Sequence, residues 1–152
     1  MGYSTYKRIA VVCQRLRRAH PKGTEMTRKE FEALVRGRYN VSADYPFTDD
    51  YESGVFRHTD SGKWFAIAMI VGCGKIGAQG EDTLDIVNFK CPPEIVESVA
   101  GVEPGVYPAY HMNKIHWLTV ALDGSCDDGL IEWLLGISYD VTSRKMSRTK
   151  RR

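Results

Sequence analysis

The sequence predicts one α+β domain with an antiparallel sheet of about five strands, and three observations support this class. Apolar residues recur at helical spacing toward both ends of the chain, and runs with strand periodicity lie between them. Turn residues join several of these runs as hairpins, which favours antiparallel pairing. The 152 residues, of which 43% are hydrophobic, suffice for one core and are few for two. The expected order is α-βββ-α-ββ-α, with an extra N-terminal helix.

Two helices are predicted at the start of the chain. Over Tyr6–Ala19, apolar residues at i, i+3, i+4 and i+7 form one stripe, with arginines on the opposite face. The segment Thr27-Arg28-Lys29-Glu30 then fits a capping box, in which the threonine oxygen and the glutamate each serve a free backbone N–H. The helix that it begins is expected to bury Phe31, Leu34, Val35 and Tyr39.

Three strands are expected next, at Val55–Thr59, Lys63–Val71 and Thr83–Cys91. Asp60-Ser61-Gly62 suits the hairpin turn between the first two, because glycine accepts a positive φ. The second strand is apolar on both faces, which indicates a central position. In the third strand the apolar phase shifts between Ile86 and Val87, which suggests a bulge. Residues 40–54 and 72–82 lack periodicity and are expected to be loops.

A short helix and an edge strand follow. Pro92 and Pro93 suit the start of a helix, which Gly101 is expected to end. A fourth strand near Val106–His111 contains Pro108, which cannot donate a ladder hydrogen bond, so this strand belongs at an edge.

The last strand and helix have clear patterns. His116–Leu122 alternates between two faces, one of them wholly aliphatic. Ser125-Cys126-Asp127-Asp128 resembles a second helix cap. The final helix is expected to bury Leu130, Ile131, Leu134, Leu135 and Val141.

The net charge of +2 conceals a strong segregation of basic and acidic residues along the chain. Residues 26–143 carry nine basic and 18 acidic groups, whereas residues 1–25 carry six basic groups and one acidic group. Residues 144–152 carry six basic groups. We therefore expect a basic N-terminal extension (1–24), an α+β domain (25–143) and a basic tail (144–152).

An acidic body is atypical of a DNA-binding core, so attraction to phosphate would come from the ends. The alternative is that the ends are solvated extensions, and the first 24 residues also fit a docking helix or a targeting peptide.

Other features exclude several protein classes. No apolar run approaches the ~20 residues of a membrane helix, and no secretory signal is evident, so no membrane partner is expected. The four cysteines form no CxxC pair, which argues against a zinc site or a disulfide framework. The sequence thus predicts a cytoplasmic protein with reduced thiols.

Five motifs together resemble a known family. They are Val55-Phe56-Arg57-His58, Lys63-Trp64-Phe65-Ala66, Val87-Asn88-Phe89-Lys90-Cys91-Pro92-Pro93-Glu94, His111-Met112-Asn113-Lys114 with His116-Trp117, and Ser138-Tyr139. Their order and distances resemble the MmcQ/YjbR family of small bacterial proteins over residues 26–145. The resemblance implies a curved antiparallel sheet backed by helices, similar to frataxin-like and secretion-chaperone-like domains. Members are commonly labelled DNA-binding, because the sheet resembles the "double wing" of a phage transcription factor.

The chain departs from the family pattern at two places. Gly105–Tyr110 precedes His111 where the family usually has proline-glycine-tyrosine-histidine, and the basic N-terminal helix is extra. Both departures concern the geometry near His111 rather than the fold.

Polar residues on or beside the predicted strands, including Asn88, are expected to form a locally positive patch at one end of the open sheet face. Its basic groups would capture phosphate, and its indoles would stack on bases. The expected nucleic-acid-binding residues are Arg57, His58, Lys63, Trp64, Lys90, Asn113, Lys114, His116 and Trp117. An alternative is that Asn113 and the histidines fasten a tight turn and that Lys63 is a solvated edge lysine.

Catalytic and metal sites are weaker hypotheses. Cys91 lies at a predicted helix N-terminus, where a nearby imidazole would complete a Cys–His pair, but no third orienting group is evident. The spacing of His111 and His116 does not match a helical zinc pair, although His58 with Asp60 or Asp85 would add ligands. We predict no catalytic constellation, no metal and no cofactor.

These observations predict a small, non-enzymatic, cytoplasmic bacterial binding protein. Its expected partner is nucleic acid, bound non-specifically and in a salt-dependent manner through the open sheet and the basic ends. One alternative is a protein-interaction or chaperone-like module with a protein partner. A second is an enzyme that uses the His111–Trp117 cluster. The oligomeric state is left open.

Overall fold

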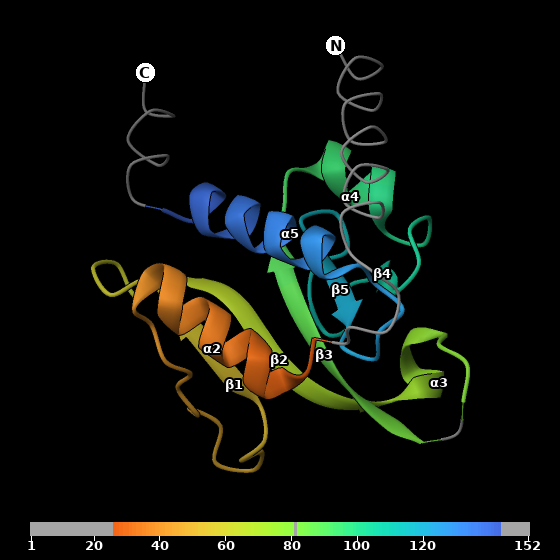
Figure 1. Cartoon of the computed structure of the whole chain (residues 1–152), viewed down its shortest axis with the longest axis horizontal. Coiled ribbons are helices and arrows are strands. Elements are labelled where there is room, and N and C mark those ends of the chain that lie inside the picture. Colours follow the sequence, from red (N-terminus) through yellow and green to blue (C-terminus); the bar gives the residue numbers. More distant parts are fainter. Residues whose placement is uncertain (1–25, 81, 144–152) are drawn as a thin grey trace.

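An open five-stranded antiparallel sheet of order β1-β2-β3-β5-β4 forms the centre of the computed structural model, which describes residues 26–80 and 82–143 (Figure 1). The strands are β1 (Gly54–Arg57), β2 (Trp64–Gly72), β3 (Thr83–Lys90), β4 (Val106–Pro108) and β5 (Trp117–Ala121). The described helices are α2 (Arg28–Tyr39), α3 (Cys73–Ile76), α4 (Pro93–Val99) and α5 (Asp128–Val141). The order confirms the predicted α+β class, and the helix expected at Tyr6–Ala19 lies outside the described residues.

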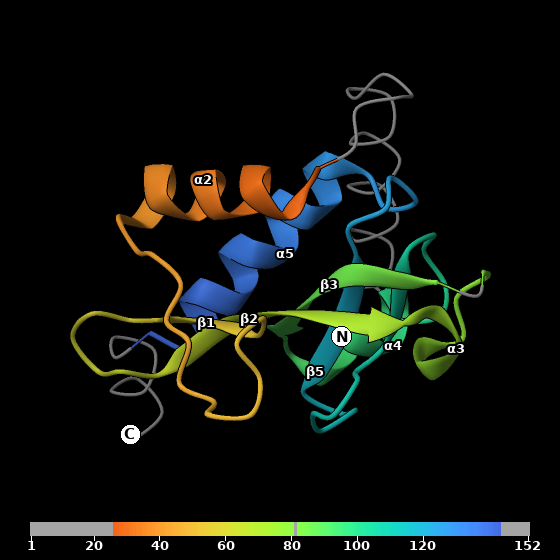
Figure 2. The ribbon, with the colours of Figure 1, turned by 90° about the horizontal axis from the view of Figure 1, so that it is seen from below.

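The helices α2 and α5 pack together on one face of the sheet (Figures 1 and 2). The Phe31 ring of α2 lies 5.5 Å from Phe56 of β1 and 5.8 Å from Phe89 of β3, between ring centroids. Tyr39 of α2 stacks on Tyr139 of α5 at 3.8 Å. The same core includes Val96 and Val99 of α4. Burial of these apolar side chains is the main stabilising contribution on this face.

Two connecting segments lie on the opposite face. In Figure 2 both long helices are above the sheet, and the segment between α2 and β1 runs down past β1 to the other side. Within residues 40–53, Asp44 exchanges backbone hydrogen bonds of 2.8 and 2.7 Å with Val55 of β1. Residues 109–116 lie over β3, where the Asn88 side chain donates to the Tyr110 carbonyl at 3.2 Å. These loops bury the centre of this face, including Ile67, Asn88 and Thr119, and leave side chains at its margins partly accessible.

The sheet contains one bulge, and its position differs from the prediction. β3 pairs in continuous register with both neighbours, so the prediction of a bulge between Ile86 and Val87 is wrong. Both side chains are fully buried, because β3 is covered on its two faces. The shift in register falls instead between Phe56 and Arg57, where Phe65 of β2 is the extra residue.

Local signals at the helix ends had mixed outcomes. Thr27 is the N-cap of α2, and its hydroxyl accepts the Glu30 N–H at 3.2 Å, as predicted. Asp127 is the N-cap of α5, but its side chain makes no capping hydrogen bond.

The loop expected at residues 72–82 contains the one-turn helix α3, so that prediction was wrong in part. Within residues 26–80 and 82–143, every helix is too short or too polar to cross a bilayer.

Both edges of the sheet are short. β4 has three residues and ends at Pro108, which confirms the predicted edge position of this strand. β1 has four residues, and the bridge to Asp44 occupies part of its outer side.

Candidate functional site

Two cationic and two indole side chains form a row across the loop-bordered face of the sheet. Arg57 pairs with Trp64 between β1 and β2, and Lys90 pairs with Trp117 between β3 and β5. The pairing of Ala66 with Phe89 brings both pairs to the same end of the sheet. Strand alternation directs Arg57, Lys90 and Trp117 away from α2 and α5, and the extra residue in β2 turns Trp64 to the same face. We call these four residues the aromatic–basic row; each is partly exposed.

Arg57 has two partners that fix its position in the row. Its guanidinium lies 2.9 Å from the Asp44 carboxylate, and its Cζ atom is 5.7 Å from the centroid of the Trp64 ring. The Nε atom is buried and has no hydrogen-bond partner. Asp44 therefore offsets part of the positive charge of this residue, while the Trp64 ring contributes a cation–π contact.

His58 does not join the row. Its side chain is buried on the helix-covered face, where Nε2 lies 2.8 Å from the Thr142 hydroxyl. The imidazole centroid is 5.2 Å from Phe65 and 4.3 Å from Tyr139. Burial lowers the pKa of His58, because it disfavours the charged imidazolium. This histidine stabilises the contact between α5 and the end of β1.

The predicted residues after β4 lie beside the row, but they mainly shape their own loop. The Asn113 carboxamide oxygen accepts the N–H groups of Ile115 (2.8 Å) and His116 (3.2 Å), as the alternative reading expects. Lys114 Nζ donates to the Ala109 carbonyl at 3.0 Å. The His116 side chain is exposed next to Trp117, and Lys63 is exposed at the end of the β1–β2 turn.

A buried polar network holds residues 109–116 against the sheet. The Thr119 hydroxyl donates to Asn88 Oδ1, and it accepts the Tyr110 N–H at 2.9 Å. Asn88 Nδ2 donates to the Tyr110 carbonyl, and both Asn88 and Thr119 have no exposed surface. The sequence interpretation placed Asn88 among the polar surface residues. The sequence did carry one indication that this amide is buried, because Asn88 lies between Val87 and Phe89 in an apolar strand.

A cavity of about 610 Å³ opens beside Trp64 on the same face. Three separate segments of the chain line it. They are Pro46–Asp50 before β1, Trp64, Ile67 and Met69 of β2, and His111 and Met112 after β4. No single motif in the sequence indicates this cavity, because its walls come together only when the two loops fold onto the sheet.

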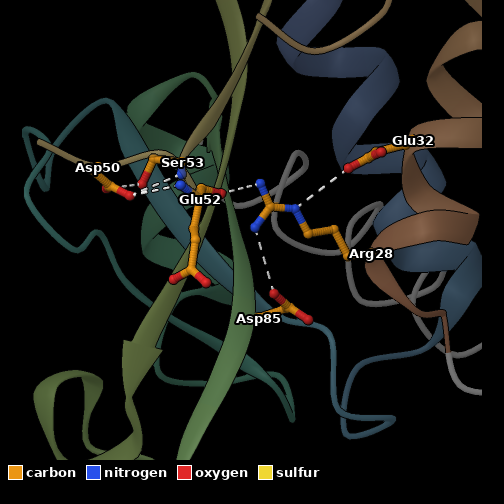
Figure 3. Close-up of polar contacts among 6 residues, drawn as sticks. All are labelled: Arg28, Glu32, Asp50, Glu52, Ser53 and Asp85. Carbon is orange, nitrogen blue, oxygen red and sulfur yellow. Dashed lines mark hydrogen bonds and ion pairs between the residues drawn. The ribbon is translucent and has the colours of Figure 1, made fainter. Parts of the chain in front are cut away.

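The loop wall of the cavity is fixed by the hydrogen bonds drawn in Figure 3. The Asp50 carboxylate accepts the N–H groups of Glu52 and Ser53, each at 3.1 Å, and the Ser53 hydroxyl. The hydrogen bond from the Ser53 side chain is the main cause of a lowered Asp50 pKa, so this carboxylate is ionised at neutral pH. Arg28 of α2 donates to the Glu52 carbonyl and also lies 3.7 Å from the Asp85 carboxylate, which ties the loop to β3.

Cys91 lacks the properties of a nucleophile. Its side chain is buried, and burial raises the pKa of the thiol to about 12. The Cys91 N–H donates to the His116 carbonyl at 2.9 Å, so the contact between these residues is a backbone contact. In the described part of the chain, no three His, Cys, Asp or Glu side chains are placed to hold a metal ion.

Comparisons with known proteins agree with this fold. A sequence model of the YjbR family matches residues 36–141. The Bacillus subtilis protein YyaQ, itself uncharacterized, is 35% identical over 117 residues, which span 77% of this chain and 98% of YyaQ. The Escherichia coli K12 protein YjbR is 38% identical over 66 residues, which span 43% of this chain and 56% of YjbR.

Solved structures show the same architecture. A crystal structure of a Pseudomonas syringae protein superposes with a TM-score of 0.75 at 38% identity and covers 78% of this chain and 100% of its own. A Deinococcus radiodurans protein described as a DUF419 domain superposes with a TM-score of 0.59 at 27% identity, covering 78% of this chain and 80% of its own.

Proposed function

The chain belongs to the YjbR family, and we propose that it is a non-enzymatic protein that binds single-stranded nucleic acid along the aromatic–basic row. One observation carries this proposal. Two cations alternate with two indoles across neighbouring strands, on the face that α2 and α5 leave free. Proteins that bind single strands without sequence preference combine these two elements, a basic track for the backbone and aromatic platforms for the bases.

The spacing of the row suits more than one nucleotide. Trp64 and Trp117 lie on strands that are separated by β3. Strands are ~4.8 Å apart, so the two indoles are carried on strands about 10 Å apart. Lys90 lies on the strand between them, so we expect its ammonium to contact a phosphate that links two stacked bases.

The charge distribution predicts modest affinity. The described domain has an acidic excess, and Asp44 offsets part of the charge of Arg57. Long-range attraction to phosphate would come from the basic ends, which carry six basic groups each. We therefore expect micromolar, non-specific binding that weakens steeply as the salt concentration rises.

Fluorescence anisotropy with a labelled oligothymidylate and the full chain tests this proposal. Trp117→Ala should weaken binding about 5-fold to 150-fold, since stacking contributes ~1–3 kcal/mol per base. Lys90→Ala should reduce the slope of log K against log salt by ~0.7, as expected for one lost phosphate contact to a single strand. Lys75→Ala on α3 is the matched control and should change neither quantity.

Removal of residues 144–152 distinguishes the contribution of the aromatic–basic row to binding from that of the basic tail. If the row binds the strand, the truncated protein should bind more weakly but still respond to Trp117→Ala. The proposal is wrong if the full chain does not bind the oligonucleotide, or if binding depends on the tail and is unchanged in the Trp117→Ala, Lys90→Ala double variant.

A further inference from the structure

We propose that the cavity beside Trp64 is a second binding site, which shares only Trp64 with the aromatic–basic row, and that it binds an organic cation, a ligand that joins an alkylated ammonium group to a small apolar body. This inference goes beyond the proposed function and does not depend on it. It rests on the shape of the cavity, on its aromatic walls and on the sign of its charges.

The cavity has the size and the composition of a small-molecule site. Its volume of about 610 Å³ falls within the range of ~300–1,000 Å³ that is usual for such sites. Ile67 and Met69 of β2 supply an apolar floor, and Met112 supplies a second thioether. Thioether side chains adapt to ligands of different outline, because they are flexible and polarizable.

Two aromatic rings form perpendicular walls. The centroids of Phe47 and Trp64 are 6.1 Å apart, and their planes meet at 89°. A ring face attracts a cation through its quadrupole, and cages of such rings recognise alkylated ammonium groups. The Trp64 ring already makes one contact of this kind, with the guanidinium of Arg57.

The charges that line the cavity select for a cation. Asp49 and Asp50 contribute two carboxylates, and among the described residues no lysine or arginine belongs to the lining. The lowered pKa of Asp50 keeps its charge at neutral pH, although its oxygen atoms already accept three hydrogen bonds. Asp49 is exposed at the rim, and within residues 26–80 and 82–143 it has no hydrogen-bond or ion-pair partner, so it is available as a counter-ion. An anionic ligand would meet two like charges and is disfavoured.

Choline and its neutral isostere 3,3-dimethyl-1-butanol test this assignment. Both are titrated into the full chain, and binding is followed by NMR through the Trp64 indole N–H and the methyl groups of Met69 and Met112. Choline should shift these signals and bind at least about 5-fold more tightly than the alcohol, because only the cation gains the ring and carboxylate interactions. Equal affinities, or choline shifts that map elsewhere, would overturn the proposal.

Matched variants separate this site from the aromatic–basic row. Asp49→Asn and Phe47→Leu should each weaken choline binding about 3-fold to 10-fold, and Phe47→Tyr, which keeps the ring, should preserve it. Phe47 and Asp49 are both exposed, so these variants should fold. Lys90→Ala should leave choline binding unchanged while it weakens oligonucleotide binding, and Asp49→Asn should not weaken oligonucleotide binding. Choline affinity that is unaffected by both Asp49→Asn and Phe47→Leu would refute the site.

Discussion

Replacement of Ser138 by alanine should destabilise the protein far more than the loss of one hydroxyl suggests. Ser138 lies on the sheet side of α5 and is fully buried. Its hydroxyl donates to the Phe65 carbonyl and accepts the Lys90 N–H at 2.8 Å. Phe65 is the extra residue of the β1–β2 bulge, where the regular ladder is interrupted. One side chain thus satisfies two main-chain groups of adjacent strands at the end of the sheet that carries the aromatic–basic row.

The magnitude follows from those two groups. A buried donor or acceptor that loses its partner costs ~1–3 kcal/mol, so Ser138→Ala should lower the free energy of unfolding by about 2–4 kcal/mol after the alanine's smaller desolvation cost is included. For a domain of this size, that loss corresponds to a fall in Tm of about 5–15 °C.

Urea unfolding followed by tryptophan fluorescence measures this loss. Ser98→Ala is the matched control, because Ser98 is also buried but its hydroxyl donates to the Glu94 carbonyl within α4. We expect the control to change the free energy of unfolding by less than about 1 kcal/mol. A Ser138→Ala variant within about 0.5 kcal/mol of the parent, at an unchanged m-value, would refute the reasoning, since it would mean that water or a local shift satisfies both groups.

Three further predictions follow from buried groups. Asn88→Ala should lower the free energy of unfolding, measured in urea, by about 2–4 kcal/mol. A double-mutant cycle with Thr119→Val should give a coupling energy of about 1 kcal/mol, and strictly additive effects would contradict the network. Cys91 should resist iodoacetamide at pH 8 in the native protein and react after unfolding, since burial raises its pKa to about 12; equal rates in both states would contradict this. The folded-state pKa of His58 is lowered, so its contribution to stability should be complete above the unfolded pKa of ~6.5 and decline as the pH falls toward the folded-state pKa. This dependence should be smaller in His58→Phe, as measured by the free energy of unfolding at successive pH values.

The order of elements was predictable because local chemistry determines it. Thr27 marks the start of α2, Pro108 restricts β4 to an edge, and alternation assigns Leu118 and Val120 to the core. The short helix α3 was missed because a single turn has no room for helical periodicity. The bulge was misplaced because Ile86 and Val87 are both buried, and a strand covered on two faces loses the alternation that reveals its phase.

The candidate site was predictable in part. Alternation placed Arg57, Lys90 and Trp117 on one face, since side-chain direction along a strand is a local property, whereas Trp64 reaches that face only through the bulge in β2. His58 faces the helices because it directly follows Arg57, and adjacent residues of an extended strand point to opposite faces, so the two side chains cannot share one patch. The cavity was not predictable, because Phe47, Trp64 and His111 meet only through the tertiary contacts that hold two loops on the sheet.

The short borders of the sheet carry a consequence for behaviour at high concentration. A long border strand with free N–H and C=O groups invites pairing with another molecule and growth of intermolecular β-structure. Here one border ends after three residues at a proline, and the other is partly occupied by Asp44. Neither side offers an extended template for a foreign strand, so a protein with a broad, partly apolar sheet surface is protected from polymerising through its edges.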